Sequence, residues 1–134
     1  MNFFLPMNPP TITHQEKRIA VKNGKPVVYE DEQLKAARAK LTAYLAVHRP
    51  QRPMEGPVRL VVKWCFPDKA RKHGHGTYRT TKPDTDNLNK MLKDCMTACR
   101  FWTDDAQVAS EIIEKFWVRE KQGIFIEVSE IEQV

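Results

Sequence analysis

Residues 82–107 read KPDTDNLNKMLKDCMTACRFWTDDAQ, a helical pattern with two aspartates ahead of it and two more behind it. Apolar side chains recur here at intervals of three and four residues, so they form one continuous face of a helix that begins near Asp86. That face consists of Leu88, Met91, Leu92, Cys95, Met96 and Cys99. The spacing predicts an amphipathic helix that packs inward on this face and carries acidic residues at both of its ends.

The two acidic pairs are separated by the whole length of this helix. Pro83 biases the residue before it away from helical angles, so we expect an extended segment that presents Asp84 and Asp86 on one side. Asp104 and Asp105 follow a helix of about 14 residues, which is roughly 21 Å long. The pairs therefore meet only if the next strand runs back along the helix. Three or four carboxylates gathered in this way repel one another and need a hard cation such as Mg²⁺ between them.

Each of these residues also has an ordinary structural explanation. An aspartate at a helix start is a common N-cap, and paired aspartates are common in turns. Lys90, one turn past Asp86, is either a solvated charge on the helix flank or a cation beside the acids that contacts a phosphate. Phe101 and Trp102 are either core residues or aromatic platforms for an opened base. The residue pattern alone leaves these alternatives open.

The rest of the chain alternates between strand and helix patterns. We expect, in order, a strand at residues 2–5, a hairpin at 19–22 and 26–29 around the turn Asn23-Gly24, a helix at 31–48, a buried strand at 58–66, and strands at 108–118 and 123–131. A chain of 134 residues with 41% hydrophobic content suits one domain with one core. The prediction is an α+β fold, a single small domain over residues 1–134 with a mixed β-sheet and two main helices.

The chain carries 22 lysines and arginines against 17 acids, a net charge of +5 that favours an anionic partner such as nucleic acid. Basic residues gather in a loop directly before the first acids, where they are expected to contact DNA phosphates. These residues are Lys69, Arg71, Lys72, Arg79 and Lys82. The alternative is that the loop is only a solvated linker.

Other classes of site are disfavoured by the sequence. His73 and His75 with Cys95 and Cys99 do not predict zinc, because the cysteines lie on the apolar helix face and no Cys-x-x-Cys occurs. A calcium-binding loop is excluded because the Asp-x-Asp segment lacks the glycine and the final glutamate of that motif. No apolar run approaches the roughly 18 residues of a membrane span, and no signal peptide is recognisable. We expect a cytoplasmic protein without membrane contact.

The acidic segments are similar to a known family. The residues that carry the resemblance are the run from Pro83 to Leu88, Lys90, Asp94 and the run from Phe101 to Val108. They resemble the RusA family of Holliday junction resolvases, small endonucleases encoded largely by phages and prophages. The resemblance implies a homodimer that cuts four-way DNA junctions with Mg²⁺, or with Mn²⁺ in its place. It also implies that Asp84, Asp86 and Asp105 are metal-binding catalytic acids and that Lys90 acts as a base or contacts phosphate. The chain departs from the family at Arg100, where a glycine often closes the helix.

Two functions are compatible with the sequence. The first is a Mg²⁺-dependent, structure-selective endodeoxyribonuclease that resolves four-way junctions by paired phosphodiester hydrolysis in DNA recombination and repair. The second is a non-catalytic branched-DNA-binding module of the same fold, whose acids are only caps and turn residues. Acids gathered beside a basic loop favour the nuclease, because a binding module has no chemical need for them.

Overall fold

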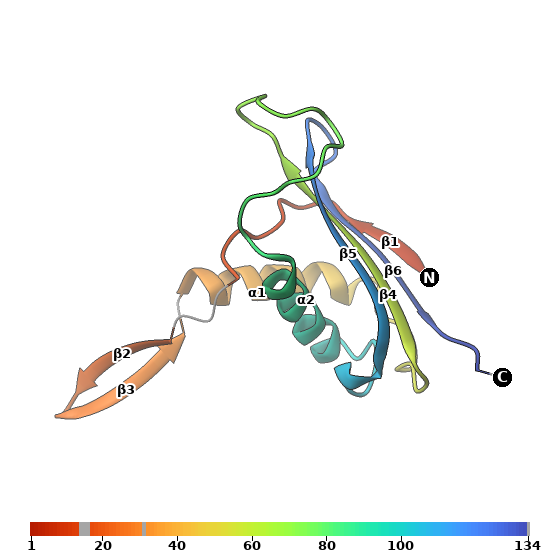
Figure 1. Ribbon diagram of the computed structural model, residues 1–134. Helices are drawn as coiled ribbons and strands as arrows, with labels where there is room; N and C mark the ends of the chain where they lie inside the picture. The colour runs from red at the N-terminus through yellow and green to blue at the C-terminus, as the bar shows by residue number, and fades with distance from the viewer. Residues whose placement is uncertain (14–16, 31, 134) are drawn as a thin grey trace.

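The computed structural model describes residues 1–13, 17–30 and 32–133 (Figure 1). Its elements are, in chain order, β1 (Asn2–Leu5), β2 (Lys17–Lys22), β3 (Lys25–Glu30), α1 (Glu32–Ala46), β4 (Val58–Pro67), α2 (Thr85–Ala98), the short 3-10 helix η1 (Asp105–Gln107), β5 (Val108–Val118) and β6 (Gly123–Glu130). Every strand and helix expected from the sequence is present within a few residues of its predicted bounds, although residue 31, the predicted start of the first helix, lies outside the described residues. No described helix is long and apolar enough to cross a membrane.

Four strands form one mixed sheet in the order β1-β6-β4-β5. The β6 strand pairs antiparallel with β1 and β4, whereas β4 and β5 are parallel. Parallel neighbours need a crossover connection, and α2 supplies it, so α2 runs back from the end of β4 to the start of β5. The α+β fold with a mixed sheet and two main helices is therefore confirmed.

Both helices lie on one face of the sheet and share its core (Figure 1). The inward residues of the central strand β4 are fully or almost fully buried: Val58, Leu60, Val62, Trp64 and Phe66. Against them pack the predicted apolar face of α2 and three leucines of α1. Cys99 is only 6% exposed, so the predicted face extends to the residue after α2. The 3.6-residue periodicity of the sequence thus identified the core helix correctly.

The β2–β3 hairpin forms a separate two-stranded sheet that stands away from the rest of the domain (Figure 1). Its turn is the predicted one, because Asn23 and Gly24 both have positive φ, 53° and 75°. Such angles are those of the tight turns that asparagine and glycine favour in hairpins. The hairpin is peripheral, as expected.

Candidate active site

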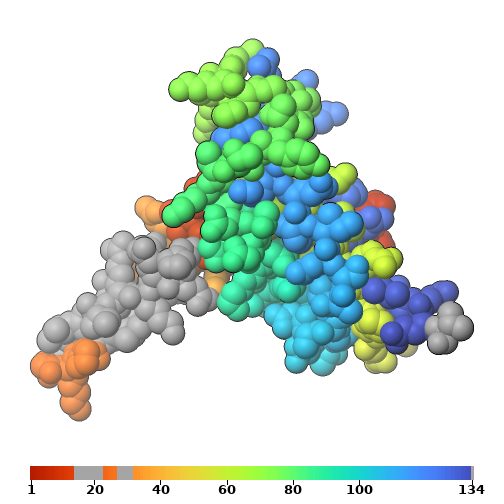
Figure 2. Space-filling model, in the orientation of Figure 1, coloured from red at the N-terminus to blue at the C-terminus, as the bar shows by residue number. Residues whose placement is uncertain are grey.

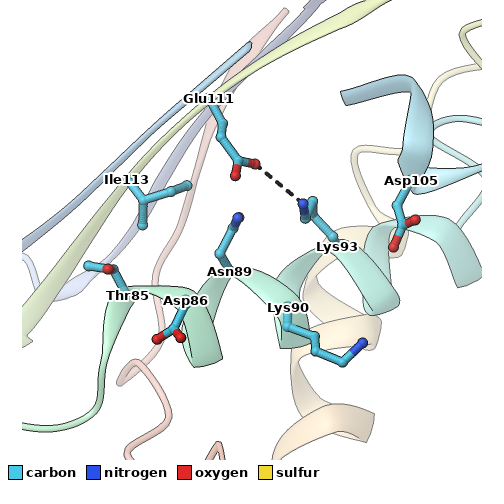
Figure 3. Close-up of a pocket in the computed structure, with 8 residues that line it drawn as sticks. All are labelled: Thr85, Asp86, Asn89, Lys90, Lys93, Asp105, Glu111 and Ile113. Carbon is cyan, nitrogen blue, oxygen red and sulfur yellow. Dashed lines mark ion pairs between the residues drawn. The ribbon is translucent and has the colours of Figure 1, made fainter. Parts of the chain in front are cut away.

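A groove with a volume of about 450 Å³ runs between α2 and β5 (Figure 3). Its lining residues are Thr85, Asp86, Asn89, Lys90, Lys93, Asp105, Glu111 and Ile113. Most of the lining comes from one side of α2, with η1 and β5 completing it. Three of the four residues predicted to be catalytic, Asp86, Lys90 and Asp105, therefore face the same surface hollow.

The first acidic pair lies at the N-terminus of α2. Asp84 is the N-cap residue with extended backbone (φ −74°, ψ 149°), yet its carboxylate makes no capping hydrogen bond. The prediction of an extended segment is correct at Asp84 and wrong at Asp86, because α2 already begins at Thr85. The Leu88 N–H donates to the Asp84 carbonyl at 3.1 Å, which starts the helical ladder directly after the proline. Both carboxylates are exposed, and within the described part of the chain that of Asp86 accepts only the adjacent Asn87 N–H, at 3.0 Å.

The second acidic pair divides into two roles. The Asp104 carboxylate accepts the Ala106 N–H at 2.8 Å, and the Gln107 Oε1 atom accepts the Asp104 N–H at 3.0 Å, which together form a capping box. Asp105 follows as the first residue of η1, is half-buried, and turns its carboxylate toward the groove (Figure 3). No hydrogen bond or ion pair to another described residue occupies that carboxylate. The ordinary structural explanation thus applies to Asp104 and not to Asp105.

The two acidic pairs do not converge in the way the sequence suggested. The return strand β5 does run back along α2, but Asp105 precedes it and therefore stays near the C-terminal half of the helix. Figure 3 shows Asp86 and Asp105 at opposite ends of the groove, with Lys90 and Lys93 between them. Among the described residues, no three His, Cys, Asp or Glu side chains are grouped closely enough to hold a metal ion. The ligand set of three acids stays a prediction.

Two lysines of α2 face the groove and differ in their partners. The Lys93 Nζ atom lies 3.4 Å from the Glu111 Oε2 atom on β5, so this pair bridges the two walls. The Lys90 Nζ atom lies 3.9 Å from Asp94 Oδ2 on its own helix, and the Lys90 side chain is 68% exposed. An exposed pair at this distance contributes little stability, so the Lys90 ammonium can move to another anion at small cost.

The predicted basic loop is held in shape by a buried acid. Asp68 is only 6% exposed, and its carboxylate accepts the N–H groups of Lys72 (3.3 Å) and His73 (2.9 Å). In Figure 2 this loop stands at one end of the domain, above α2 and β5. Four of the five predicted DNA-contacting side chains are exposed and form no ion pair with described residues: Lys69, Arg71, Lys72 and Lys82.

Comparison with known proteins assigns the family. The sequence model described as Endodeoxyribonuclease RusA matches residues 6–129. The chain belongs to the RusA family. It is 32% identical over 121 residues to the crossover junction endodeoxyribonuclease rusA of Lactococcus phage r1t, covering 89% of each protein. It is also 31% identical over 113 residues to the uncharacterized protein YqaN of Bacillus subtilis (strain 168), covering 77% of this chain and 79% of YqaN. The resemblance seen in the sequence is confirmed, and the chain is a nuclease enzyme.

The fifth predicted DNA contact, Arg79, has a different environment in this RusA-family protein. Its guanidinium carbon lies 4.3 Å from the centre of the Phe66 ring and 4.4 Å from that of Trp117. The guanidinium also donates to the Thr81 hydroxyl and to the Lys82 carbonyl. Burial lowers the pKa of Arg79 from its ordinary value, although an arginine remains charged. Arg79 therefore holds the loop together, and its contact with DNA stays a prediction.

Lys115, on β5, fixes the segment that leads into α2. Its Nζ atom donates to the carbonyls of Thr81 and Pro83, each at 2.8 Å. Burial is the main cause that lowers the pKa of Lys115, with a smaller contribution from the charge of Arg79, while the charge of Asp84 opposes both. Arg79 and Lys115 thus bind three successive carbonyls immediately before Asp84. The backbone that presents this acid is held by two cations from outside α2.

The structure settles one alternative raised by the sequence. Phe101 and Trp102 are fully buried, and the Trp102 indole donates to the Thr97 hydroxyl at 2.7 Å, so both are core residues. Cys95 and Cys99 are buried against α1, with burial raising the pKa of both thiols. The His73 ring stacks on Trp117, a residue of β5, with ring centres 4.4 Å apart.

The sequence reading missed Asn89, Lys93, Glu111 and Lys115. Asn89 and Lys93 follow Asp86 at three and seven residues, so helical spacing already placed them on the same side of α2 as that acid. Asn89 is 7% exposed, and its Oδ1 atom has no hydrogen-bond partner within the described chain. For Glu111 and Lys115 no local signal existed, because their partners lie across the groove or many residues away in the chain.

Proposed function

We propose that this RusA-family enzyme is a structure-selective endodeoxyribonuclease that resolves four-way DNA junctions by Mg²⁺-dependent phosphodiester hydrolysis. The observation that carries the proposal is the groove between α2 and β5, where Asp86 and Asp105 face a hollow beside Lys90. Neither carboxylate is paired with a cation in the described chain, and an exposed basic loop adjoins the groove. The name of the Lactococcus phage r1t relative supports this substrate class.

The donor groups of the site suit Mg²⁺, with Mn²⁺ as an alternative. Mg²⁺ keeps several waters and is usually held by one or two carboxylates together with substrate phosphates, not by a closed cage of protein ligands. Asp84 and Asp86 at the N-terminus of α2 would provide the one or two carboxylates of such a site, whereas Asp105 lies at the opposite end of the groove. When bound, the ion would supply an activated water and offset the charge of the transition state.

The residues of the chain perform the remaining tasks. Asp84, Asp86 and Asp105 would provide the hard oxygen ligands, and Lys115 and Arg79 hold the backbone that presents Asp84. The Lys90 ammonium is long, exposed and weakly paired, so it can contact the phosphate that is being cut. The exposed cations of the loop, Lys69, Arg71, Lys72 and Lys82, bind flanking phosphates and draw DNA toward the acids.

We further propose that two copies act together as a homodimer. A four-way junction is resolved by two matched cuts, and a twofold pair places identical sites on opposite strands. The enzyme would be encoded by a phage or prophage gene and would act in DNA recombination and repair in the cytoplasm of the host.

A single assay tests the proposal against the non-catalytic alternative. The protein is incubated with a synthetic four-way junction and Mg²⁺, and with a linear duplex of the same sequence. We expect paired nicks in the junction, loss of cutting with EDTA, and little cutting of the duplex. Binding without cutting in Mg²⁺ or Mn²⁺ would contradict the proposal and leave the branched-DNA-binding module.

A further inference from the structure

A second group of free cations lies at the other end of α2 from the basic loop. Arg49 and Arg100 line a surface pocket of about 540 Å³ together with Pro50, Gln51 and Pro53. Both arginines are exposed, and neither guanidinium forms a hydrogen bond or ion pair with a described residue. The pocket contains no acid among its lining residues. Its chemistry is therefore that of an anion-binding site.

The backbone at Arg100 is unfavourable for an arginine. Arg100 has φ 63°, in the left-handed region, and follows the helix C-cap Cys99. The Arg100 N–H donates to the Thr97 carbonyl and the Phe101 N–H to the Met96 carbonyl, which is the pattern of a Schellman motif. Glycine is the favoured residue at this position because it has no Cβ to clash. Arg100 therefore adopts this conformation at an energetic cost that a glycine would not incur.

The pocket is attached to the Asp105 end of the groove. The Met54 N–H donates to the Phe101 carbonyl at 2.9 Å, and the Gln107 side-chain amide donates to the carbonyls of Met54 (2.8 Å) and Gly56 (3.0 Å). These bonds fasten the loop that carries Arg49 and Pro53 to the segment that carries Asp105. The basic loop lies at the opposite end of α2 (Figures 1 and 2). Cations thus flank the acidic groove on both sides.

We propose that Arg49 and Arg100 form a second phosphodiester-binding site, which holds the backbone of the DNA arm that leaves the groove on the Asp105 side. The proposal rests on the proposed function and names a further contact for the same substrate. The planar guanidinium group matches phosphate oxygens and donates to two of them at once. A 14-residue helix is about 21 Å long, so the two basic regions are separated by roughly six phosphate intervals of one strand at 3.4 Å each.

Arg100→Gly is the most informative variant, because it removes the guanidinium and relieves the backbone at the same position. It should fold at least as stably as wild type, with an equal or higher melting temperature. Junction affinity, measured by gel shift in Ca²⁺ or EDTA, should fall about five- to tenfold. The double variant Arg49→Gln/Arg100→Gly should lower the slope of log K against log salt by about two, since each lost phosphate contact removes about 0.9.

Two comparisons separate the proposal from its rivals. Lys63→Gln removes a cation from β4 that lies over the Phe125 ring, and it should leave affinity unchanged. Shortening the junction arms should weaken wild-type binding and leave the double variant nearly unaffected, which couples the arginines to the DNA arm. A pocket that binds only free phosphate would show no such coupling and would contradict the proposal. Unchanged junction affinity in folded Arg100→Gly would also contradict it, because Arg100 would then be only a charge at the helix end. If wild type fails to bind the junction at all, the proposed function is wrong together with this site; if wild type binds and the variants match it, only this site is wrong.

Discussion

Asp104 and Asp105 are adjacent in the chain, yet the Asp104 carboxylate accepts the Ala106 N–H at 2.8 Å while the Asp105 carboxylate faces the groove between α2 and β5. Asp104 caps the N-terminus of η1 and is exposed. Asp105 is half-buried and has no partner in the described chain. One dipeptide therefore contains a structural acid beside a candidate catalytic acid, and it offers a matched pair of variants.

Asp104→Ala removes a capping acceptor and should lower the free energy of unfolding by about 1 kcal/mol, while junction cutting by the folded protein changes little. Asp105→Asn keeps the size of the side chain and should leave stability near wild type, while cutting falls about a hundredfold. Urea denaturation and single-turnover cleavage on both variants check this. Equal cleavage rates for Asp105→Asn and wild type would remove Asp105 from the site.

Lys115 is expected to act as a positioning residue. Lys115→Met leaves the carbonyls of Thr81 and Pro83 without their shared donor, so the segment before Asp84 should lose its fixed conformation. We expect the single-turnover cleavage rate to fall at least about tenfold, with Mg²⁺ needed at higher concentration, and stability to fall by about 1–3 kcal/mol. Lys115→Arg retains several donors and should recover most of the rate.

The readout that matters for Lys115 is the apparent Mg²⁺ affinity, since a purely structural loss would reduce the amount of folded protein and leave that affinity unchanged. The comparison is made below the melting temperature of each variant. If Lys115→Met needs no more Mg²⁺ than wild type, Lys115 does not position the acids.

Local periodicity was enough to predict the core helix, because the apolar face of α2 is a property of neighbouring residues. The order of strand and helix patterns predicted the elements of the sheet, but it did not predict which of its strands would be parallel. Contacts between distant residues could not be predicted from the sequence. The Lys115 ammonium, for example, donates to the Pro83 carbonyl although the two residues are 32 positions apart in the chain. Arg79 looked like one more basic loop residue, and only the fold shows that the rings of Phe66 and Trp117 enclose it.

The sequence predicted some residues of the candidate site, because Asp86, Lys90 and Asp105 line the groove, but it did not predict the layout of the site. The run around Asp84 and Asp86 and the segment containing Asp105 are the parts that resemble the family. Their separation along the groove depends on where η1 ends and β5 begins relative to α2. The direction of β5 along α2 does not by itself predict that Asp105 lies near the C-terminal half of this helix.

The buried thiols predict how stability depends on pH. Burial raises the pKa of Cys95 and of Cys99 above the ordinary value of 9.0, so the folded protein keeps these protons at a pH where the unfolded chain has lost them. The free energy of unfolding should therefore decline as pH rises above about 9. Denaturant titrations at pH 8, 9 and 10 measure it. Cys95→Ala/Cys99→Ala should show a shallower decline, and an equal decline would contradict this cause.

The homodimer is tested by mass in solution. Light scattering at micromolar concentration should give twice the chain mass of 15.6 kDa, with and without junction DNA. Paired cutting requires both sites, so mixing wild type with excess Asp105→Asn should yield junctions that are nicked on one strand only. A monomer under both conditions would contradict the twofold arrangement.

The central claim is that the acids of the groove are needed for cutting and not for binding. Asp86→Asn keeps the shape of the side chain and removes one negative charge, so a bound Mg²⁺ loses part of its ligand charge while the basic loop is unaltered. Asp84→Asn should behave in the same way, and the loss of Lys90 should weaken cutting with some loss of binding.

The most direct measurement compares wild type and Asp86→Asn on the same junction. Binding is measured by gel-shift titration in EDTA, and cutting by a single-turnover cleavage assay in Mg²⁺. Circular dichroism confirms that the variant is folded. Cleavage should fall at least about a hundredfold, equivalent to roughly 3 kcal/mol of transition-state stabilisation, while affinity stays equal or rises because an acid near the phosphates is gone. A folded Asp86→Asn protein that cuts at the wild-type rate would contradict the account, as would one that loses binding and cutting together.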